Sequence, residues 1–248
     1  MKKWCFTFIV VLLSGMSVIH AQEAVLGENT TIYKTEYKLE AQINSFGWGF
    51  GGKIGQYQGA MNRIQLGFDV IILTHPKEIK TFNPYYEDGK GYFFGKMNSV
   101  ILLKPSIGFE KLLSEKYRKT GVQISYTMQA GPSFAVLKPV YLEIGKPRFP
   151  YEYIDVERYN PEVHSIEDIY GRASYINGLS KIKMSYGINA SVGLNFEYSN
   201  VSDGIRGLSV GVMIDAFSKE LPIMALAENK KIFAGFYIAL FYGKKYVR

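Results

Sequence analysis

A stretch late in the chain alternates strictly between apolar side chains and polar or small ones. Lysine, serine, glycine and asparagine fill the positions between its apolar residues, which are Ile182, Met184, Tyr186, Ile188, Ala190, Val192, Leu194 and Phe196. A period of two predicts a β-strand with one apolar and one polar face. The stretch is longer than the roughly five or six residues of a usual strand. A strand tilted across a bilayer needs about 9–11 residues, so the pattern predicts a membrane-spanning β-strand.

Similar alternation recurs along the chain and predicts eight strands, at 36–46, 47–57, 62–74, 97–113, 120–144, 182–198, 205–217 and 231–244. The connections alternate between short turns (58–62, 114–119, 199–204) and long loops (75–96, 145–181, 218–230). Bacterial barrels have this arrangement, with short periplasmic turns and long outer loops. We therefore predict an all-β fold, an antiparallel transmembrane β-barrel of eight strands with long aromatic outer loops.

Two alternatives to this fold stay open. A break at Gly131-Pro132 would split the segment 120–144, and a further strand within a loop would then give ten strands. A soluble β-sandwich is the other alternative, but it would need turn signals every 8–12 residues or so.

The first 21 residues have the features of a secretory signal peptide. Lys2 and Lys3 precede an apolar segment, and Ala21 offers a small residue for cleavage. We expect a signal peptide at 1–21, a lead-in segment at 22–35 and a barrel domain at 36–248, with export through the Sec pathway. A retained signal anchor is the alternative. Cys5 is the single cysteine of the chain, so the exported part is expected to form no disulfide.

The lumen-facing positions combine glycines with isolated charges. The glycines would leave room for larger neighbours, and the charges would pair with one another in the lumen; the charged residues are Arg63, Asp69, Lys183, Glu197 and Asp215. Because side chains fill an eight-stranded barrel, this prediction disfavours a general porin. A narrow channel remains the alternative if the barrel has ten strands or more.

The overall charge gives little support to a nucleic-acid partner. The formal net charge is +7, and the lysines and arginines are spread along the chain rather than clustered. We expect no nucleic-acid partner and no cofactor.

Two histidines of the predicted outer loops are the candidates for enzymatic chemistry. His75 and Glu78 of one loop could join Glu162 and His164 of another as a metal site with two histidines and two carboxylates. The alternative is that each histidine hydrogen-bonds within its own loop. No Gly-x-Ser-x-Gly motif is present, which disfavours a serine esterase. We therefore expect a protein that is not an enzyme.

The long loops contain many tyrosines together with arginines, the residues that dominate protein interfaces. We predict partner contacts at Tyr85, Tyr86, Tyr151, Tyr153, Arg158, Arg172, Ile223 and Met224. The apolar run that contains Ile223 and Met224 should be covered by a partner or fold back over the barrel mouth. The alternative for the aromatic loops is that they pack only on each other.

Four segments resemble an uncharacterised family of small outer-membrane β-barrel proteins of Bacteroidota-type bacteria. They are His75–Lys80, Asn83–Glu87, Lys138–Ile144 and Ile169–Ala173. The resemblance covers essentially the whole chain after the signal peptide and implies no catalytic residues. It suggests a subunit of one of the outer-membrane protein machines of such bacteria.

These expectations lead to one functional hypothesis and two alternatives. We expect a non-enzymatic, integral outer-membrane barrel that contacts membrane lipid and binds other outer-membrane proteins or lipoproteins through its outer loops. As an accessory subunit it would serve barrel assembly, with type IX secretion as the next candidate. The alternatives are a narrow solute channel and a barrel enzyme that acts on lipid A or a surface substrate.

Overall fold

The computed structural model describes residues 33–86, 88–116, 121–147, 150–198, 203–225 and 227–247. The predicted signal peptide and most of the predicted lead-in segment lie outside the described residues. Within the described ranges, no helix is long and apolar enough to cross a membrane.

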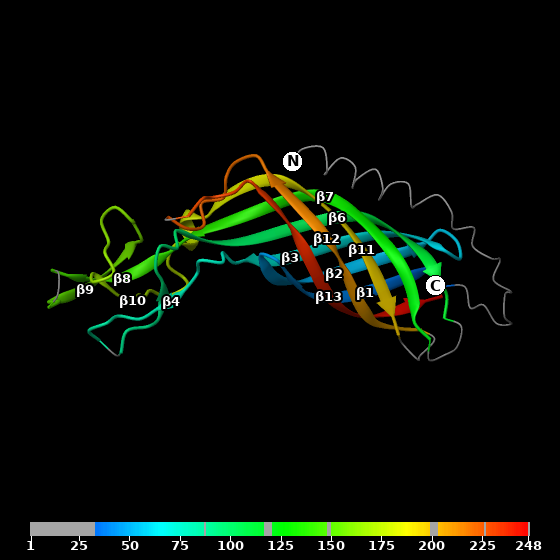
Figure 1. Cartoon of the computed structure of the whole chain (residues 1–248), viewed down its shortest axis with the longest axis horizontal. Helices are drawn as coiled ribbons and strands as arrows, with labels where there is room; N and C mark the ends of the chain where they lie inside the picture. The colour runs from blue at the N-terminus through cyan, green and yellow to red at the C-terminus, as the bar shows by residue number, and fades with distance from the viewer. Residues whose placement is uncertain are drawn as a thin grey trace, which may run out of the picture. The chain divides into compact units, whose positions relative to one another are not determined.

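Eight antiparallel strands close into a barrel (Figure 1), which confirms the predicted fold class and strand number. Around the barrel the order is β1-β13-β12-β11-β7-β6-β3-β2, and β1 pairs with β2 to complete the ring. The barrel strands are β1 (Thr35–Asn44), β2 (Gly47–Tyr57), β3 (Asn62–Leu73), β6 (Asn98–Ser114), β7 (Gln123–Pro139), β11 (Lys183–Glu197), β12 (Gly204–Phe217) and β13 (Ile232–Tyr246).

Strand β7 runs through Gly131-Pro132 without a break, so the ten-strand alternative is wrong. Its pairing with β6 lapses between Leu103–Phe134 and Ile107–Ala130, where each strand carries a proline without an N–H. The Asn189 side chain on β11 donates hydrogen bonds to the carbonyls of Gly131 (3.0 Å) and Pro132 (2.8 Å). The Pro132 carbonyl faces β6, so a side chain satisfies a backbone acceptor that the lapsed ladder leaves unpaired.

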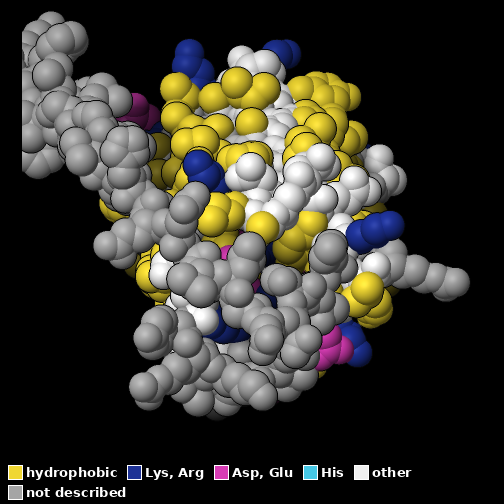
Figure 2. Space-filling view, turned by 90° about the vertical axis from the view of Figure 1, so that its right-hand side faces the viewer, with side chains coloured by type: hydrophobic (Ala, Val, Ile, Leu, Met, Phe, Trp, Pro, Cys, Tyr) yellow, Lys and Arg dark blue, Asp and Glu magenta, His cyan; other side chains and the backbone are white. Residues whose placement is uncertain are grey.

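The outward-facing side chains of the barrel are apolar and exposed. Leu39, Ile188 and Phe236 have exposed fractions of 70%, 68% and 72%. Figure 2 shows hydrophobic side chains over much of the visible wall. A continuous apolar surface of this kind is stable in lipid and unstable in water, so the barrel spans a membrane.

Aromatic residues gather near both ends of this apolar wall. Tyr37 and Tyr246 meet edge to face at 5.5 Å near the chain ends, and the Arg206 guanidinium lies over the Tyr242 ring. At the opposite end, Trp48 contacts Phe50. Such aromatic girdles mark the two membrane interfaces of transmembrane barrels.

The connections between strands differ strongly at the two ends. We name the end with the turns after β2, β6 and β11 the short-turn end, and the opposite one the long-loop end. Two small sheets occupy the long loops, β4 (Lys80–Thr81) with β5 (Tyr92–Phe93), and β8 (Tyr141–Lys146) between β9 (Tyr153–Arg158) and β10 (Ile169–Arg172). A short 3-10 helix, η1 (Leu179–Lys181), precedes β11. The predicted strand 120–144 thus divides near Pro139, and its last residues join a sheet outside the barrel.

Candidate functional site: the closed lumen and the long-loop cluster

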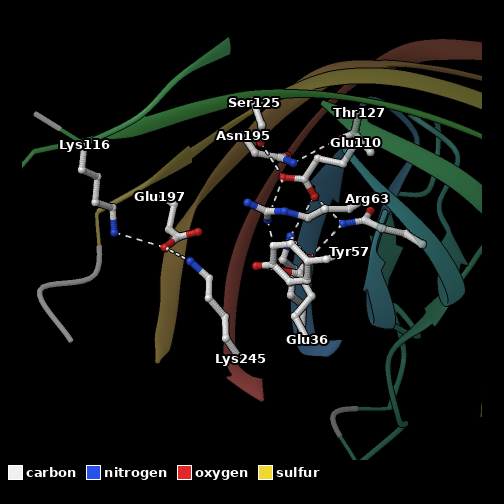
Figure 3. A network of polar contacts seen from close by, with 12 residues as sticks. Glu36, Tyr57, Arg63, Glu110, Lys116, Ser125, Thr127, Asn195, Glu197 and Lys245 are labelled. Atoms are coloured by element: carbon white, nitrogen blue, oxygen red, sulfur yellow. Dashed lines mark hydrogen bonds and ion pairs between the residues drawn. The ribbon is translucent and has the colours of Figure 1, made fainter. Parts of the chain in front are cut away.

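A buried ionic network fills the lumen near the short-turn end (Figure 3). At its centre, the Glu110 carboxylate lies 2.9 Å from the Lys38 ammonium and 3.4 Å from the Arg63 guanidinium. Glu36 contacts the same two cations at 2.8 and 3.1 Å. Gln65 and Ser125 also donate hydrogen bonds to Glu110. Alternation places these side chains inside because their neighbours in sequence face lipid.

Further ion pairs lie above and below this network. Lys53 contacts Glu40 at 2.8 Å, and Lys104 contacts Asp215 at 2.9 Å. Nearer the short-turn end, Glu197 accepts from Lys116 (3.1 Å) and Lys245 (2.8 Å). The Lys53–Glu40 pair links the neighbouring strands β1 and β2, whereas the pairs of Asp215 and Glu197 join strands that are not neighbours and so brace the barrel across its interior.

The prediction that five lumen charges pair with one another is wrong. Arg63, Glu197 and Asp215 do lie in the lumen, but each pairs with a residue outside the predicted set. Asp69 is partly buried and its Oδ1 has no hydrogen-bond partner. Lys183 is exposed at the first residue of β11, beyond the filled part of the lumen. Parity alone identifies the face of a residue, but not how deep in the barrel it lies.

The charges described in the lumen balance. Six cations face six acids, namely Lys38, Lys53, Arg63, Lys104, Lys116 and Lys245 with Glu36, Glu40, Asp69, Glu110, Glu197 and Asp215. A neutral interior lacks the one-sided charge that concentrates an ion in a pore. This part of the lumen therefore acts as a structural brace.

An apolar plug closes the lumen at the long-loop end. Leu221, Ile223 and Met224 of the loop after β12 are buried against inward-facing residues of the barrel, which include Ile71, Leu73, Val100, Leu102, Ala135 and Leu137. The Asn98 amide donates to the Pro222 carbonyl at 2.7 Å, and the Met97 N–H donates to the Ile223 carbonyl at 2.9 Å. The loop thus folds back over the barrel mouth, and the predicted role of Ile223 and Met224 as partner contacts is wrong.

The histidine and carboxylate residues predicted as a metal site are not brought together. The backbone N–H of His75 donates to the Glu78 carboxylate within one loop, and this carboxylate also pairs with the Lys96 ammonium. His164 accepts from the Asn160 N–H through Nδ1, so its Nε2 donates to Glu157 at 3.1 Å. Exposed Glu162 contributes to neither group, and the described residues contain no cluster of three or more potential metal ligands. Each histidine ring accepts a hydrogen bond from a backbone N–H of its own loop, His75 from Lys77 and His164 from Asn160.

The two long loops before β6 and β11 pack on each other into what we name the long-loop cluster, residues 75–96 and 140–178 as far as described. Its small core consists of Tyr92, Leu142, Ile144, Tyr159 and Ile169. Burial raises the pKa of the Tyr92 phenol to about 12, and neighbouring tyrosines add to this. A loop region with its own buried core has a defined surface.

The tyrosines and arginines predicted as partner contacts divide between the inside and the surface of this cluster. Tyr86 stacks on Tyr151 at 5.3 Å, and the Tyr151 hydroxyl accepts from the Asn83 amide. Both rings therefore hold the loops together. Tyr85, Tyr153, Arg158 and Arg172 are exposed.

The exposed apolar residues of the cluster include a group on β9. Tyr153, Ile154 and Val156 are 58%, 47% and 44% exposed. Their strand stays in place because it pairs with β8 along its full length and because Lys146 bridges to Glu157. Lys146 and then His164 hold the pKa of the Glu157 carboxyl below 4.5. The exposed apolar side chains of β9 make it the surface of the cluster best suited to a protein partner.

Sequence patterns missed the apolar plug and most partners in the ionic network. The runs Val70–Leu73 and Val100–Leu103 are apolar at both parities, and this was the available signal that the lumen turns apolar near one end. No local pattern indicated that Lys38 or Glu110 would meet Arg63. That contact depends on closure of the barrel.

No protein-family model and no curated protein matches the chain. Among solved structures, the chain is similar to Neisserial surface protein A (TM-score 0.40, 9% identity, 86% of this chain and 96% of that chain covered). It is also similar to the N-terminal β-barrel domain of Pseudomonas aeruginosa OprF (TM-score 0.38, 9% identity, 87% and 100% covered). A third similar structure is the attachment invasion locus protein Ail of Yersinia pestis (TM-score 0.36, 9% identity, 86% and 95% covered). The resemblance to a Bacteroidota-type family stays a prediction.

Proposed function

We propose that this protein is a non-enzymatic, integral outer-membrane β-barrel that docks another outer-membrane protein or lipoprotein through its long-loop cluster. The proposal rests on one observation: strand β9 exposes the apolar side chains of Tyr153, Ile154 and Val156 on a folded cluster above a closed barrel. An even number of antiparallel strands, with short turns at one end and long loops at the other, supports the outer-membrane location.

The closed lumen supports a docking role over transport. An apolar plug lies above an ionic network, and a solute would have to displace both layers. The metal set of His75 and His164 is the part of the enzyme alternative that the structure does not favour, because the two histidines hydrogen-bond within separate parts of the loops.

The partner complex we favour is a multi-subunit outer-membrane machine in which this barrel is an accessory subunit. Barrel assembly is the first candidate and type IX secretion the second. Both candidates rest on the character of the loops and on the resemblance of His75–Lys80 and the other quoted segments to small barrels of Bacteroidota-type bacteria.

The test is isolation of the protein from its own outer membrane in mild detergent, through an affinity tag after Arg248. We expect stoichiometric recovery of a large barrel or lipoprotein, identified by mass spectrometry. The double variant Tyr153→Ser with Ile154→Ser should lose this partner, whereas Ile79→Ser, an exposed apolar residue of the other loop, should keep it. Recovery of the wild-type barrel alone would refute the docking function.

A further inference from the structure

Strand β9 has one hydrogen-bonding edge that no other strand of the described chain occupies. In the sheet order β10-β8-β9 it is an outer strand, paired only with β8 (Figure 1). An open strand edge presents a row of backbone donors and acceptors, which is a template for another strand.

The hydrogen bonds of the sheet show which residues face this open edge. The Tyr159 N–H donates to the Val140 carbonyl, so these residues face each other between β9 and β8. The Gly145 N–H donates to the backbone carbonyl of Asp168, on the β10 side of β8. Antiparallel pairs alternate, so the odd-numbered residues of β9 point their backbone groups at β8. Ile154, Val156 and Arg158 therefore point theirs at the open edge. In agreement, the Val156 N–H donates to the carboxylate of neighbouring Asp155 at 2.8 Å.

From this geometry we infer that β9 binds an extended segment of the partner as an additional antiparallel or parallel strand of the β10-β8-β9 sheet. The inference rests on the proposed function and specifies how its partner is held. Backbone N–H and C=O groups of Ile154, Val156 and Arg158 would supply the hydrogen bonds. The exposed side chains of Ile154 and Val156 would select apolar residues at alternate positions.

Charge argues that the added strand belongs to a different protein rather than to a second copy. Antiparallel pairing of two copies about Val156 would put Asp155 of each copy opposite Glu157 of the other. Like charges directly opposite each other destabilise a strand pair. Lys146 contacts both acids at one end of the sheet, and Arg172 lies across β8 on the same face, so the two bases of this face balance its two acids within one copy.

A single proline substitution tests the hydrogen bonds of the open edge without changing those between β9 and β8. In Val156→Pro the lost N–H is the one that faces the open edge, so the bonds between β9 and β8 remain. Proline is compatible with an edge strand. Val156→Thr changes the side chain but keeps the N–H and is the matched control. Asp155→Ala removes the carboxylate that accepts the hydrogen bond from this N–H.

The experiment compares these variants in the affinity isolation from native outer membranes. We expect Val156→Pro to reduce the recovered partner at least tenfold, Val156→Thr to lower it less than threefold, and Asp155→Ala to leave it undiminished. In the variant Ile154→Cys, the chain has one other cysteine, Cys5. Single cysteines are placed in turn along one extended segment of the partner. We expect a disulfide with the new cysteine at every second position of that segment, the period of a strand. Whether each variant still folds is checked by electrophoresis, in which a folded, unheated barrel migrates differently from the heated protein.

The possible failures are distinguishable. If the wild type recovers no partner, the docking function itself is wrong. If the wild type and Val156→Pro recover the same amount of partner, docking stands and the added strand is wrong. A disulfide between two copies of the Ile154→Cys chain, in place of one to the partner, would also overturn the inference.

Discussion

Glu110 shows how a buried carboxylate is made stable in the lumen. Lys38 and Arg63 neutralise it, and Gln65 and Ser125 donate to its remaining lone pairs. Desolvation of a single acid would cost several kcal/mol, about as much as its attraction to one cation returns. The full set of donors is therefore what makes this position tolerable for a charge.

Removal of this carboxylate should strongly destabilise the barrel. In Glu110→Ala, Lys38 and Arg63 keep only Glu36 as a shared acid, so an excess positive charge stays buried. We expect the free energy of unfolding to fall by about 3–5 kcal/mol, measured by urea titration in detergent micelles. Exposed Glu115→Ala is the control and should change it by less than about 0.5 kcal/mol. Equal effects of the two variants would contradict a bracing role.

Glu157 provides a pH-dependent contact on the surface of the long-loop cluster. Its pKa is lowered below 4.5 by the hydrogen bond from Lys146 and then by that from His164. Because the folded pKa is lowered, the contact stabilises the cluster above pH 4.5 and is lost as the pH falls through the folded value. We expect carboxyl NMR titration to give a Glu157 pKa below 4.5 that rises in Lys146→Gln. An unchanged pKa in that variant would show that Lys146 does not hold the carboxylate.

At the scale of elements, the contact between β6 and β7 depends on close backbone approach. A Cβ at Gly131 would lie 2.1 Å from the Pro105 carbonyl oxygen and 2.9 Å from the Ser106 Cα. Neither backbone atom can move without displacing its strand. Glycine is required here to let the two proline-containing strands lie side by side.

Substitution at this glycine tests the closeness of the strands. Gly131→Ala should lower the free energy of unfolding by about 1–3 kcal/mol through overpacking. Gly52→Ala is the matched control, since the nearest atom to its added Cβ is the Leu39 Cδ2 at 3.8 Å. Urea titration of both variants in micelles would check this. A Gly131→Ala barrel as stable as Gly52→Ala would show that β6 and β7 are further apart.

The elements themselves were largely predictable because alternation is a local property. Each of the eight predicted strands appears, most with small differences at the ends, while the segment 120–144 divides into β7 and the start of β8. The small sheets of the long loops were not predicted, since strands as short as Lys80–Thr81 contain too few residues to show a period. Partners across the lumen were unpredictable for another reason. Lys38 and Glu110 lie 72 positions apart and meet only when β1 and β6 belong to one closed ring.

At the scale of the whole molecule, two separate layers close the barrel. The apolar plug is fixed to Met97 and Asn98, while the ionic network lies nearer the short-turn end. Because eight strands leave an interior that side chains fill, each layer alone should block the passage.

Planar-bilayer recordings test this double closure. We expect the wild type to show no discrete conductance. A variant with Leu221, Ile223 and Met224 changed to serine should also show none, because the ionic network stays in place. Discrete openings in the wild type would restore the channel hypothesis, and openings in the serine variant alone would show that the network is permeable. A porin reconstituted in the same way is the positive control.

The span of the lumen ion pairs along the chain also constrains how the protein enters its membrane. Lys104 and Asp215 are 111 positions apart, so a sheet that is still open exposes both as unpaired charges. A lone charge at the centre of a bilayer costs several kcal/mol. The nascent sheet must therefore keep its concave side hydrated, with water or a chaperoning surface against it, until β13 reaches β1. Sealing of that last seam, the expulsion of water and the formation of the salt bridges then become a single event in biogenesis.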